Sequence, residues 1–292
     1  GPGGGRVLSR VNRLLIRSLG RVRSWLVSSS LPLYRVLAVV DQADRVGSCS
    51  VRGYPLKLSI KDYCDYAVFK SWGDDEPETL DWIDGFEPDA VLLDIGSSIS
   101  RFSLYAAARF RDRLRVYAID PDLRLSHQLA RNVALNGLGG QVTGLVLAAS
   151  SADADVDVVF DYRSPQAHVG SVSALASGVA CSYVVAARTI DTLVGTAVIR
   201  PPSYIKIDVD GYEVEVLEGA KRTLGSGVVR SLLVEVSPPT KDAVVRLLEA
   251  HGQRLRRTVP ILPTAYENLI FVGDPTTSER AEEPGARERT TT

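Results

Sequence analysis

The chain has 292 residues, of which 45% are hydrophobic and 24% are charged, and its formal net charge is −1. This length suits one large α/β domain with extensions or two small domains, and the near-neutral charge argues against a general binder of nucleic acid. The three cysteines form no CxxC pair, so the sequence indicates neither a disulfide framework nor a zinc site, and we expect a reducing, cytoplasmic compartment. No apolar run is long enough for a membrane span. The chain lacks methionine and opens GPGGG, so we expect its N-terminus to be incomplete.

Residues 1–40 form a basic extension with seven arginines and no acidic residue. Within residues 6–26, apolar side chains recur at helical spacing with arginines between them, which predicts an amphipathic helix. Two interpretations stay open. The helix packs on the domain or on a second copy in a homo-oligomer, or it lies on an anionic membrane surface as a peripheral contact.

Residues 41–89 are a lead-in segment that closes with the helical pattern ETLDWIDGF, and residues 90–273 alternate between strands and helices. The predicted strands are Ala90–Ile95, Arg115–Ile119, Val142–Ala148, Tyr204–Val209 and Ser231–Val236. The predicted helices are Ile99–Phe110, Asp122–Asn136, Tyr212–Leu224 and Lys241–His251. This alternation favours an α/β fold with a doubly wound, mostly parallel sheet.

Four further runs have β-type composition. Val156–Phe160 and Tyr183–Ala187 lie in an irregular stretch, whereas Arg254–Pro260 and Asn268–Val272 close the ordered part of the chain. Because no helix separates the last two, we expect a C-terminal antiparallel hairpin at the edge of the sheet. Residues 274–292 are rich in Pro, Thr, Glu and Arg, which is typical of a disordered tail.

The stretch VLLDIGSSISRFS predicts a buried strand that ends on Asp94 and continues through a small-residue turn into a helix. The turn residues are Gly96, Ser97, Ser98 and Ser100. Such a turn either exposes backbone N–H groups to a polar ligand at a helix N-terminus or is an ordinary strand-to-helix connection. Since only one position is glycine, the G-x-G-x-x-G pattern of dinucleotide dehydrogenases is absent, and we expect a ligand with adenosine but no pyrophosphate.

Asp120 and Pro121 follow the second strand, 24 residues after Gly96. An acid about 20 residues beyond the first turn of a nucleotide-binding βαβ unit meets the ribose hydroxyls. Asp120 alternatively caps the following helix, with Pro121 at its first position.

The densest group of acids lies in YIKIDVDGYEVEVLEGA, where Asp208 and Asp210 leave a strand together and Glu213 opens the next helix. Ligands of doubly wound sheets bind beyond the carboxyl ends of the strands, so these acids are expected to point at the ligand. They alternatively act as capping and helix-dipole partners. Lys206 is expected to pair with an acid, and Glu235 lines the same sheet edge.

In their order and spacing, VLLDIGSSISRFSLYAA, VYAIDP, TIDTLV, YIKIDVDGYEVEVLEGA and LLVEVS resemble the FkbM-type S-adenosylmethionine-dependent methyltransferases over about residues 76–273. The first motif of that family is similar to D-x-G-A-N-x-G. Here Ser98 replaces the asparagine and Ser100 the second glycine, so we expect weakened cofactor binding rather than none. Ser150 stands in the family's A-x-S-D pattern, whose acid is missing from this chain.

The resemblance implies a Rossmann-like class I methyltransferase fold, with S-adenosylmethionine as donor and a hydroxyl acceptor on a sugar, lipid or secondary metabolite. Asp208 is the first candidate to face cofactor and acceptor, and Asp210 and Glu213 are candidates for the base or for orienting the acceptor. Asp210 stands where the family commonly has Glu. His168, in a loop, is an alternative base. No third ligand accompanies the paired acids at a recognisable spacing, so no metal is expected.

Two other functions remain as alternatives. A non-catalytic scaffold that retains the fold would work through the basic helix at residues 6–26, yet it has no physical need for Asp94, Asp120 or the acids after residue 207. An NAD-dependent oxidoreductase is disfavoured by the glycine-poor turn and does not predict the closing hairpin.

Overall fold

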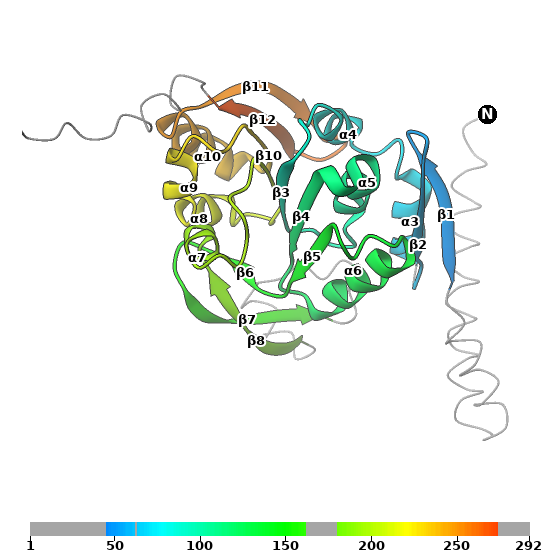
Figure 1. Cartoon of the computed structure of the whole chain (residues 1–292). Coiled ribbons are helices and arrows are strands. Elements are labelled where there is room, and N and C mark those ends of the chain that lie inside the picture. Colours follow the sequence, from blue (N-terminus) through cyan, green and yellow to red (C-terminus); the bar gives the residue numbers. More distant parts are fainter. Residues whose placement is uncertain (1–44, 62, 162–179, 274–292) are drawn as a thin grey trace, which may run out of the picture. The chain divides into compact units, whose positions relative to one another are not determined.

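The computed structural model describes residues 45–61, 63–161 and 180–273. They contain a seven-stranded sheet in the order β11-β12-β10-β9-β3-β4-β5 (Figure 1). Its strands are β3 (Ala90–Ile95), β4 (Leu114–Ile119), β5 (Val142–Leu145), β9 (Tyr204–Ile207), β10 (Ser231–Val236), β11 (Gln253–Pro260) and β12 (Glu267–Gly273).

The five strands from β5 to β10 are parallel, and β12 runs antiparallel to both β10 and β11. The predicted sheet and its closing hairpin are therefore confirmed. On one side of the β3–β9 pair the chain continues outward through β4 and β5, and on the other side it continues through β10. This pair is therefore the topological switch point of the sheet. Ligands of doubly wound folds bind at the carboxyl ends of the strands at such a point.

Helices cover both faces of the sheet (Figure 1). The first face carries α4 (Pro77–Asp84), α5 (Arg101–Phe110), η1 (Arg111–Arg113) and α6 (Leu123–Leu135), with α3 (Tyr63–Ser71) and the hairpin of β1 (Val46–Val51) and β2 (Tyr54–Ser59) outside them. The second face carries α7 (Ile190–Gly195), α8 (Glu213–Glu218), α9 (Lys221–Gly225) and α10 (Pro238–Ala250).

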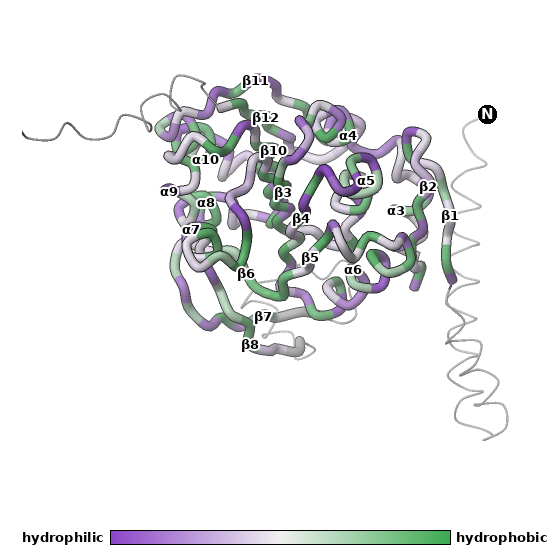
Figure 2. Tube along the Cα trace, viewed as in Figure 1, coloured by the Kyte–Doolittle hydropathy of each residue, from purple (hydrophilic) through white to green (hydrophobic). Residues whose placement is uncertain are grey.

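Each face of the sheet has its own apolar core, because side chains alternate along a strand. Leu92 and Leu233 pack on the first face, whereas Leu93 and Val234 pack on the second. The central strands are accordingly coloured mostly as hydrophobic in Figure 2. This alternation decides which polar residues at the strand ends share a face.

The predicted strand Val142–Ala148 is wrong as one element. It leaves the main sheet after Leu145, because the neighbouring β4 ends at Ile119, the register partner of that residue. The chain then enters a three-stranded sheet of β6 (Ala148–Ala149), β8 (Ala180–Arg188) and β7 (Ala154–Asp161), in that order. The two β-rich runs of the irregular stretch are thus confirmed as the antiparallel pair β7–β8.

The predicted helix Tyr212–Leu224 is also wrong as one element, because it divides into α8 and α9 around Gly219 and Ala220. A Cβ atom on Gly219 would lie 2.0 Å from the carbonyl oxygen of Ser150, so the backbones approach too closely for any side chain there. The last helix begins earlier than predicted, at Pro238, since proline suits the first turn of a helix.

Three predictions lie outside the described residues: the basic helix at residues 6–26, the tail at 274–292 and the catalytic candidate His168. Across the described ranges, no helix has both the length and the apolar character needed to cross a membrane.

Candidate functional site

Five polar side chains lie on the first face of the sheet, at the edge formed by the carboxyl ends of the parallel strands and the amino end of the antiparallel β12. Asp94 is the register partner of Lys206, and Glu235 is the partner of Asn268. Asp208 lies two residues after Lys206 and therefore continues on the same side of the chain. We call Asp94, Lys206, Asp208, Glu235 and Asn268 the polar row.

The turn that follows β3 is held tightly against the neighbouring strand ends. The backbone N–H groups of Gly96 and Ser97 donate to the carbonyl of Ile119, at 2.9 and 3.1 Å. Gly96 has φ +74°, and a Cβ atom there would lie 1.7 Å from the carbonyl oxygen of Asp208. Only glycine allows β3 and β9 to approach this closely at the switch point.

Two serines of the same turn have left-handed backbone conformations that usually favour glycine. Ser98 has φ 50°, and Ser100, at the N-cap of α5, has φ 66° and is fully buried. Among the residues that the structure describes, the Ser100 hydroxyl has only two contacts, both of 3.4 Å, with the Ser97 hydroxyl and the Ser98 carbonyl. The turn thus keeps the backbone shape that glycine would give, at a cost in backbone strain.

Asp120 is buried at the end of β4 and binds the same turn. Its Oδ2 accepts the Ser98 N–H at 2.9 Å, and its Oδ1 accepts the Asp122 N–H at 2.9 Å. Burial raises the pKa of Asp120 to about 6, although both hydrogen bonds oppose the shift. The alternative that Asp120 caps the next helix is wrong, because Asp122 is the cap and accepts the Arg124 N–H. Ribose binding by Asp120 stays a prediction.

Pro121 and Ser150 lie next to this region, but neither residue lines either of the two cavities described below. The Pro121 carbonyl accepts the Tyr183 hydroxyl at 3.1 Å, which ties the β4–α6 turn to β8. The Ser150 N–H donates to the Arg188 carbonyl at 3.0 Å, and its own carbonyl faces Gly219. The contacts of both residues therefore hold the loops that follow β4 and β6 against β8. Their contact with a cofactor stays a prediction.

A cavity of about 160 Å³ opens between the turn, α5 and the end of β9. Its lining includes Asp94, Gly96, Ser98, Arg101, Lys206 and Asp208. Asp94 is 2% exposed, and its Oδ2 accepts the Ser103 hydroxyl at 2.6 Å, whereas its Oδ1 has no hydrogen-bond partner in the described part of the chain. A buried carboxylate oxygen without a donor is expensive, so this oxygen calls for a ligand donor.

Lys206 and Asp208 form an ion pair inside the polar row. The Lys206 ammonium donates to Asp208 Oδ2 at 2.7 Å and lies 5.2 Å from the centre of the Phe102 ring. Burial by itself would lower the pKa of Lys206, but the carboxylates of Asp208, Glu76 and Asp94 raise it above its usual value. Lys206 therefore stays charged and holds the Asp208 carboxylate in place, as its predicted pairing with an acid required.

Asp210 and Glu213 lie outside the polar row. Asp210 is exposed and has φ 49°, in the turn between β9 and α8. Glu213 is 1% exposed, and its Oε1 accepts the Gly211 N–H at 2.7 Å, while burial raises its pKa. The contacts of Glu213 are those of a residue that fixes the turn, which fits the capping alternative better than a role as base.

Three residues near the site were missed from the sequence. Arg101 lines the cavity and donates to Glu76, and Asn268 donates to Glu78 at 2.8 Å and to Glu76 at 3.4 Å. Glu76 stands in the run DDEPE, which is typical of a helix start, and it is the N-cap of α4. This pattern gave no indication that the Glu76 side chain faces the site. The only signal for Asn268 was its place as the single polar residue of the predicted strand Asn268–Val272.

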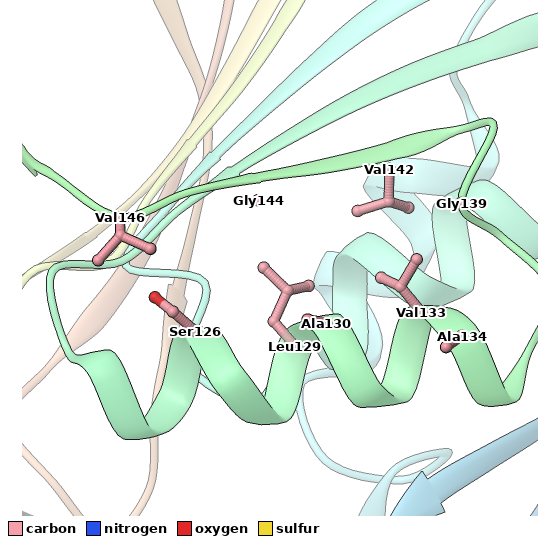
Figure 3. Close-up of a pocket in the computed structure, with 9 residues that line it drawn as sticks. All are labelled: Ser126, Leu129, Ala130, Val133, Ala134, Gly139, Val142, Gly144 and Val146. Atoms are coloured by element: carbon pink, nitrogen blue, oxygen red, sulfur yellow. The ribbon is translucent and has the colours of Figure 1, made fainter.

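A larger cavity, of about 410 Å³, lies between α6 and β5 (Figure 3). Apart from Ser126, its lining side chains are apolar, as with Leu129, Val133 and Val142. It contains none of the predicted site residues and no ionisable group, so it offers no chemistry for catalysis. Within the described ranges, no group of three or more His, Cys, Asp or Glu residues is arranged to hold a metal ion.

Comparison with known proteins gives three kinds of similarity. A model of the FkbM methyltransferase domain matches residues 94–255, which is more than half of the chain. The chain is 28% identical over 201 residues to the AMB antimetabolite synthetase AmbE of Pseudomonas aeruginosa, covering 58% of this chain but only 9% of the synthetase. It is 23% identical over 238 residues to the hexuronic acid methyltransferase AglP of Haloferax volcanii, covering 81% of this chain and 90% of AglP.

Solved structures with the same type of fold are more distant. The methyltransferase FkbM of Methylobacillus flagellatus is 16% identical, with 71% of this chain and 53% of that chain covered and a TM-score of 0.44. Aeropyrum pernix fibrillarin with bound S-adenosyl-L-methionine is 9% identical, with coverages of 85% and 86% and a TM-score of 0.45. The range matched by the domain model contains the turn at Gly96, Asp120 and all of the polar row except Asn268.

Proposed function

The chain belongs to the FkbM family of S-adenosylmethionine-dependent methyltransferases, and we propose that it methylates a hydroxyl oxygen of a sugar-type small molecule or glycan. The observation that carries the proposal is the cavity at the switch point, where the unpartnered Oδ1 of Asp94 and the carboxylate of Asp208 lie beside the turn at Gly96. The lining of the cavity thus includes two carboxylates that can accept hydrogen bonds from a ligand, Asp94 and Asp208, beside the cations of Arg101 and Lys206.

The residues present fit the cofactor of the family. Asp94 Oδ1 would accept a hydrogen bond from its ammonium group, the turn at Gly96 would pack along it, and Asp120 would lie toward its ribose. The cavity of about 160 Å³ is smaller than the roughly 300–1,000 Å³ of a whole small-molecule site, so it fits one end of the cofactor. When bound, S-adenosylmethionine supplies a methyl group on positively charged sulfur, which makes that methyl electrophilic.

The chain itself must align the acceptor with the methyl group and accept a proton. Alignment requires reacting atoms about 3–3.5 Å apart, which Asp208, held by Lys206, can support from the end of β9. A hydroxyl acceptor loses a proton on methylation, and carboxylates at the strand ends supply the bases for it. The similarity to AglP, a hexuronic acid methyltransferase, supports a sugar as acceptor class.

The first test is calorimetric titration with S-adenosylmethionine and S-adenosylhomocysteine, with NAD as control. Micromolar binding of the first two but not NAD is expected, whereas no binding of either would favour the non-catalytic alternative. The second test incubates the protein and methyl-labelled cofactor with glucuronic acid, galacturonic acid, glucose and glucosamine. Mass spectrometry of the products should show a methyl ether. A methyl ester or an N-methyl product would overturn the hydroxyl assignment, and no product from any sugar would overturn the acceptor class.

A further inference from the structure

Glu235 differs from the other carboxylates of the site in having no fixed partner. It is half-buried at the end of β10, and its carboxylate makes no hydrogen bond or ion pair to any residue that the structure describes. Asp208 is paired with Lys206, Glu213 holds the Gly211 N–H, and Asp94 accepts the Ser103 hydroxyl. Of these four carboxylates, only that of Glu235 is uncommitted in the described part of the molecule.

We propose that Glu235 is the base that removes the proton from the acceptor hydroxyl, and that the acceptor lies over the end of β10, against the Glu235 carboxylate. This inference rests on the proposed methylation of a hydroxyl group. It moves the role of base from Asp210, Glu213 and His168 to a residue on the neighbouring strand.

Two buried oxygens without donors lie at the two ends of the polar row. Asp94, whose Oδ1 has no partner, is one of the residues that line the cofactor cavity, and Asn268 Oδ1 is in a side chain with no exposed surface, beside Glu235 in the β10–β12 register. Asn268 Nδ2 donates to both Glu76 and Glu78, so the amide is oriented with its oxygen left over. Buried acceptors normally have partners, so the polar row that contains Glu235 has hydrogen-bonding capacity that the described protein groups leave unused.

The charges around Glu235 suit it to proton transfer. Burial raises its pKa to about 8, with Asp208 on β9, Glu76 at the start of α4 and Asp210 in the β9–α8 turn acting in the same direction, while Lys206 lowers it. The partner on β12, Asn268, is neutral. A base whose pKa lies close to the working pH combines adequate basicity with a useful ionised fraction.

The step balances without another reactant. As the acceptor oxygen forms its bond to the methyl carbon, the carbon–sulfur bond breaks and its electron pair remains on sulfur, which becomes a neutral thioether. The hydroxyl proton passes to a carboxylate oxygen of Glu235 and then to solvent. The products are a methyl ether, S-adenosylhomocysteine and one proton.

The test that needs no acceptor compares the affinities for S-adenosylmethionine and S-adenosylhomocysteine at pH 6.5 and 8.5. Only the first carries a sulfonium, so an ionised Glu235 beside the reacting methyl favours it. We expect the sulfonium of bound S-adenosylmethionine to lower the pKa of Glu235 by about one unit. A full one-unit change corresponds to tenfold in affinity, and only part of the titration falls between the two pH values. In the wild type, the ratio of the two dissociation constants should therefore shift toward S-adenosylmethionine by about fivefold over this range. Glu235→Gln should abolish the shift, whereas Glu235→Asp, which keeps a carboxylate, should retain part of it.

Glu249→Gln, an exposed position on α10, is the matched control and should behave as wild type. A pH-independent ratio in the wild type, or an unchanged shift in a folded Glu235→Gln, overturns the inference. With any sugar that the wild type methylates, Glu235→Gln should lower kcat about 100-fold or more and leave cofactor affinity at pH 6.5 nearly unchanged. If no sugar is methylated but the affinity ratio shifts as expected, the acceptor class is wrong and the placement of Glu235 survives.

Discussion

Replacing Gly96 by alanine tests the close approach of β3 and β9 on which the site depends. The new Cβ would lie 1.7 Å from the Asp208 carbonyl oxygen, and real Cβ atoms essentially never come within 3.0 Å of another atom, so the backbones must separate by at least 1.3 Å. Gly96 also has φ +74°, where an L-residue costs about 1–2 kcal/mol. Overpacking adds about 1–3 kcal/mol, giving a total loss of about 2–5 kcal/mol in the free energy of unfolding.

Gly137→Ala is the matched control, because Gly137 has φ +64° but no atom within 4 Å of the position that a Cβ would take. It should lose only the backbone cost of about 1–2 kcal/mol and bind S-adenosylmethionine as wild type does. Urea denaturation gives the free energies of unfolding, and calorimetry gives cofactor affinity, which we expect to fall at least about 100-fold in Gly96→Ala, or ~2.7 kcal/mol. Equal losses of stability in the two variants, with cofactor binding intact in both, would refute the reasoning.

Three further changes probe neighbouring features. Ser100→Gly relieves a left-handed residue whose hydroxyl makes only long contacts within the described residues, so the free energy of unfolding should rise by about 0.5–1 kcal/mol and cofactor binding should tighten; a less stable, weaker-binding variant contradicts this. Because the pKa of Asp120 is raised to about 6, its contribution to stability is present below about pH 4 and is lost as pH rises through 6, by up to ~3 kcal/mol. Urea titrations of Asp120→Asn should lack this decline, and parallel pH curves for variant and wild type would count against the assignment. Asp191→Ala removes the acceptor of the Arg222 and Thr223 N–H groups at the start of α9, so unfolding in urea should show a loss of about 1–2 kcal/mol, and no loss would mean that these bonds are replaced by water.

The strands at the centre of the sheet were predictable because their surroundings are uniform. The predicted Ala90–Ile95 and Ser231–Val236 coincide with β3 and β10. A strand buried on both faces of a parallel sheet is a continuous apolar run that ends where polar residues begin. The divisions of Val142–Ala148 and Tyr212–Leu224 were not predictable, since the first depends on where β4 ends and the second on contact between Gly219 and Ser150, which are remote in the chain.

The sequence by itself determined the order of the strands and helices, the acids at strand ends and the small-residue turn, because these follow from local periodicity and residue type. Which acids act together was decided only by the tertiary structure. Register and the alternation of faces place Glu235 beside Asn268 and Asp94 beside Lys206, whereas Glu213 turns back to its own loop. Spacing along the chain does not encode these contacts, since strand order brings β9 between β3 and β10 and the side-chain period then selects the face.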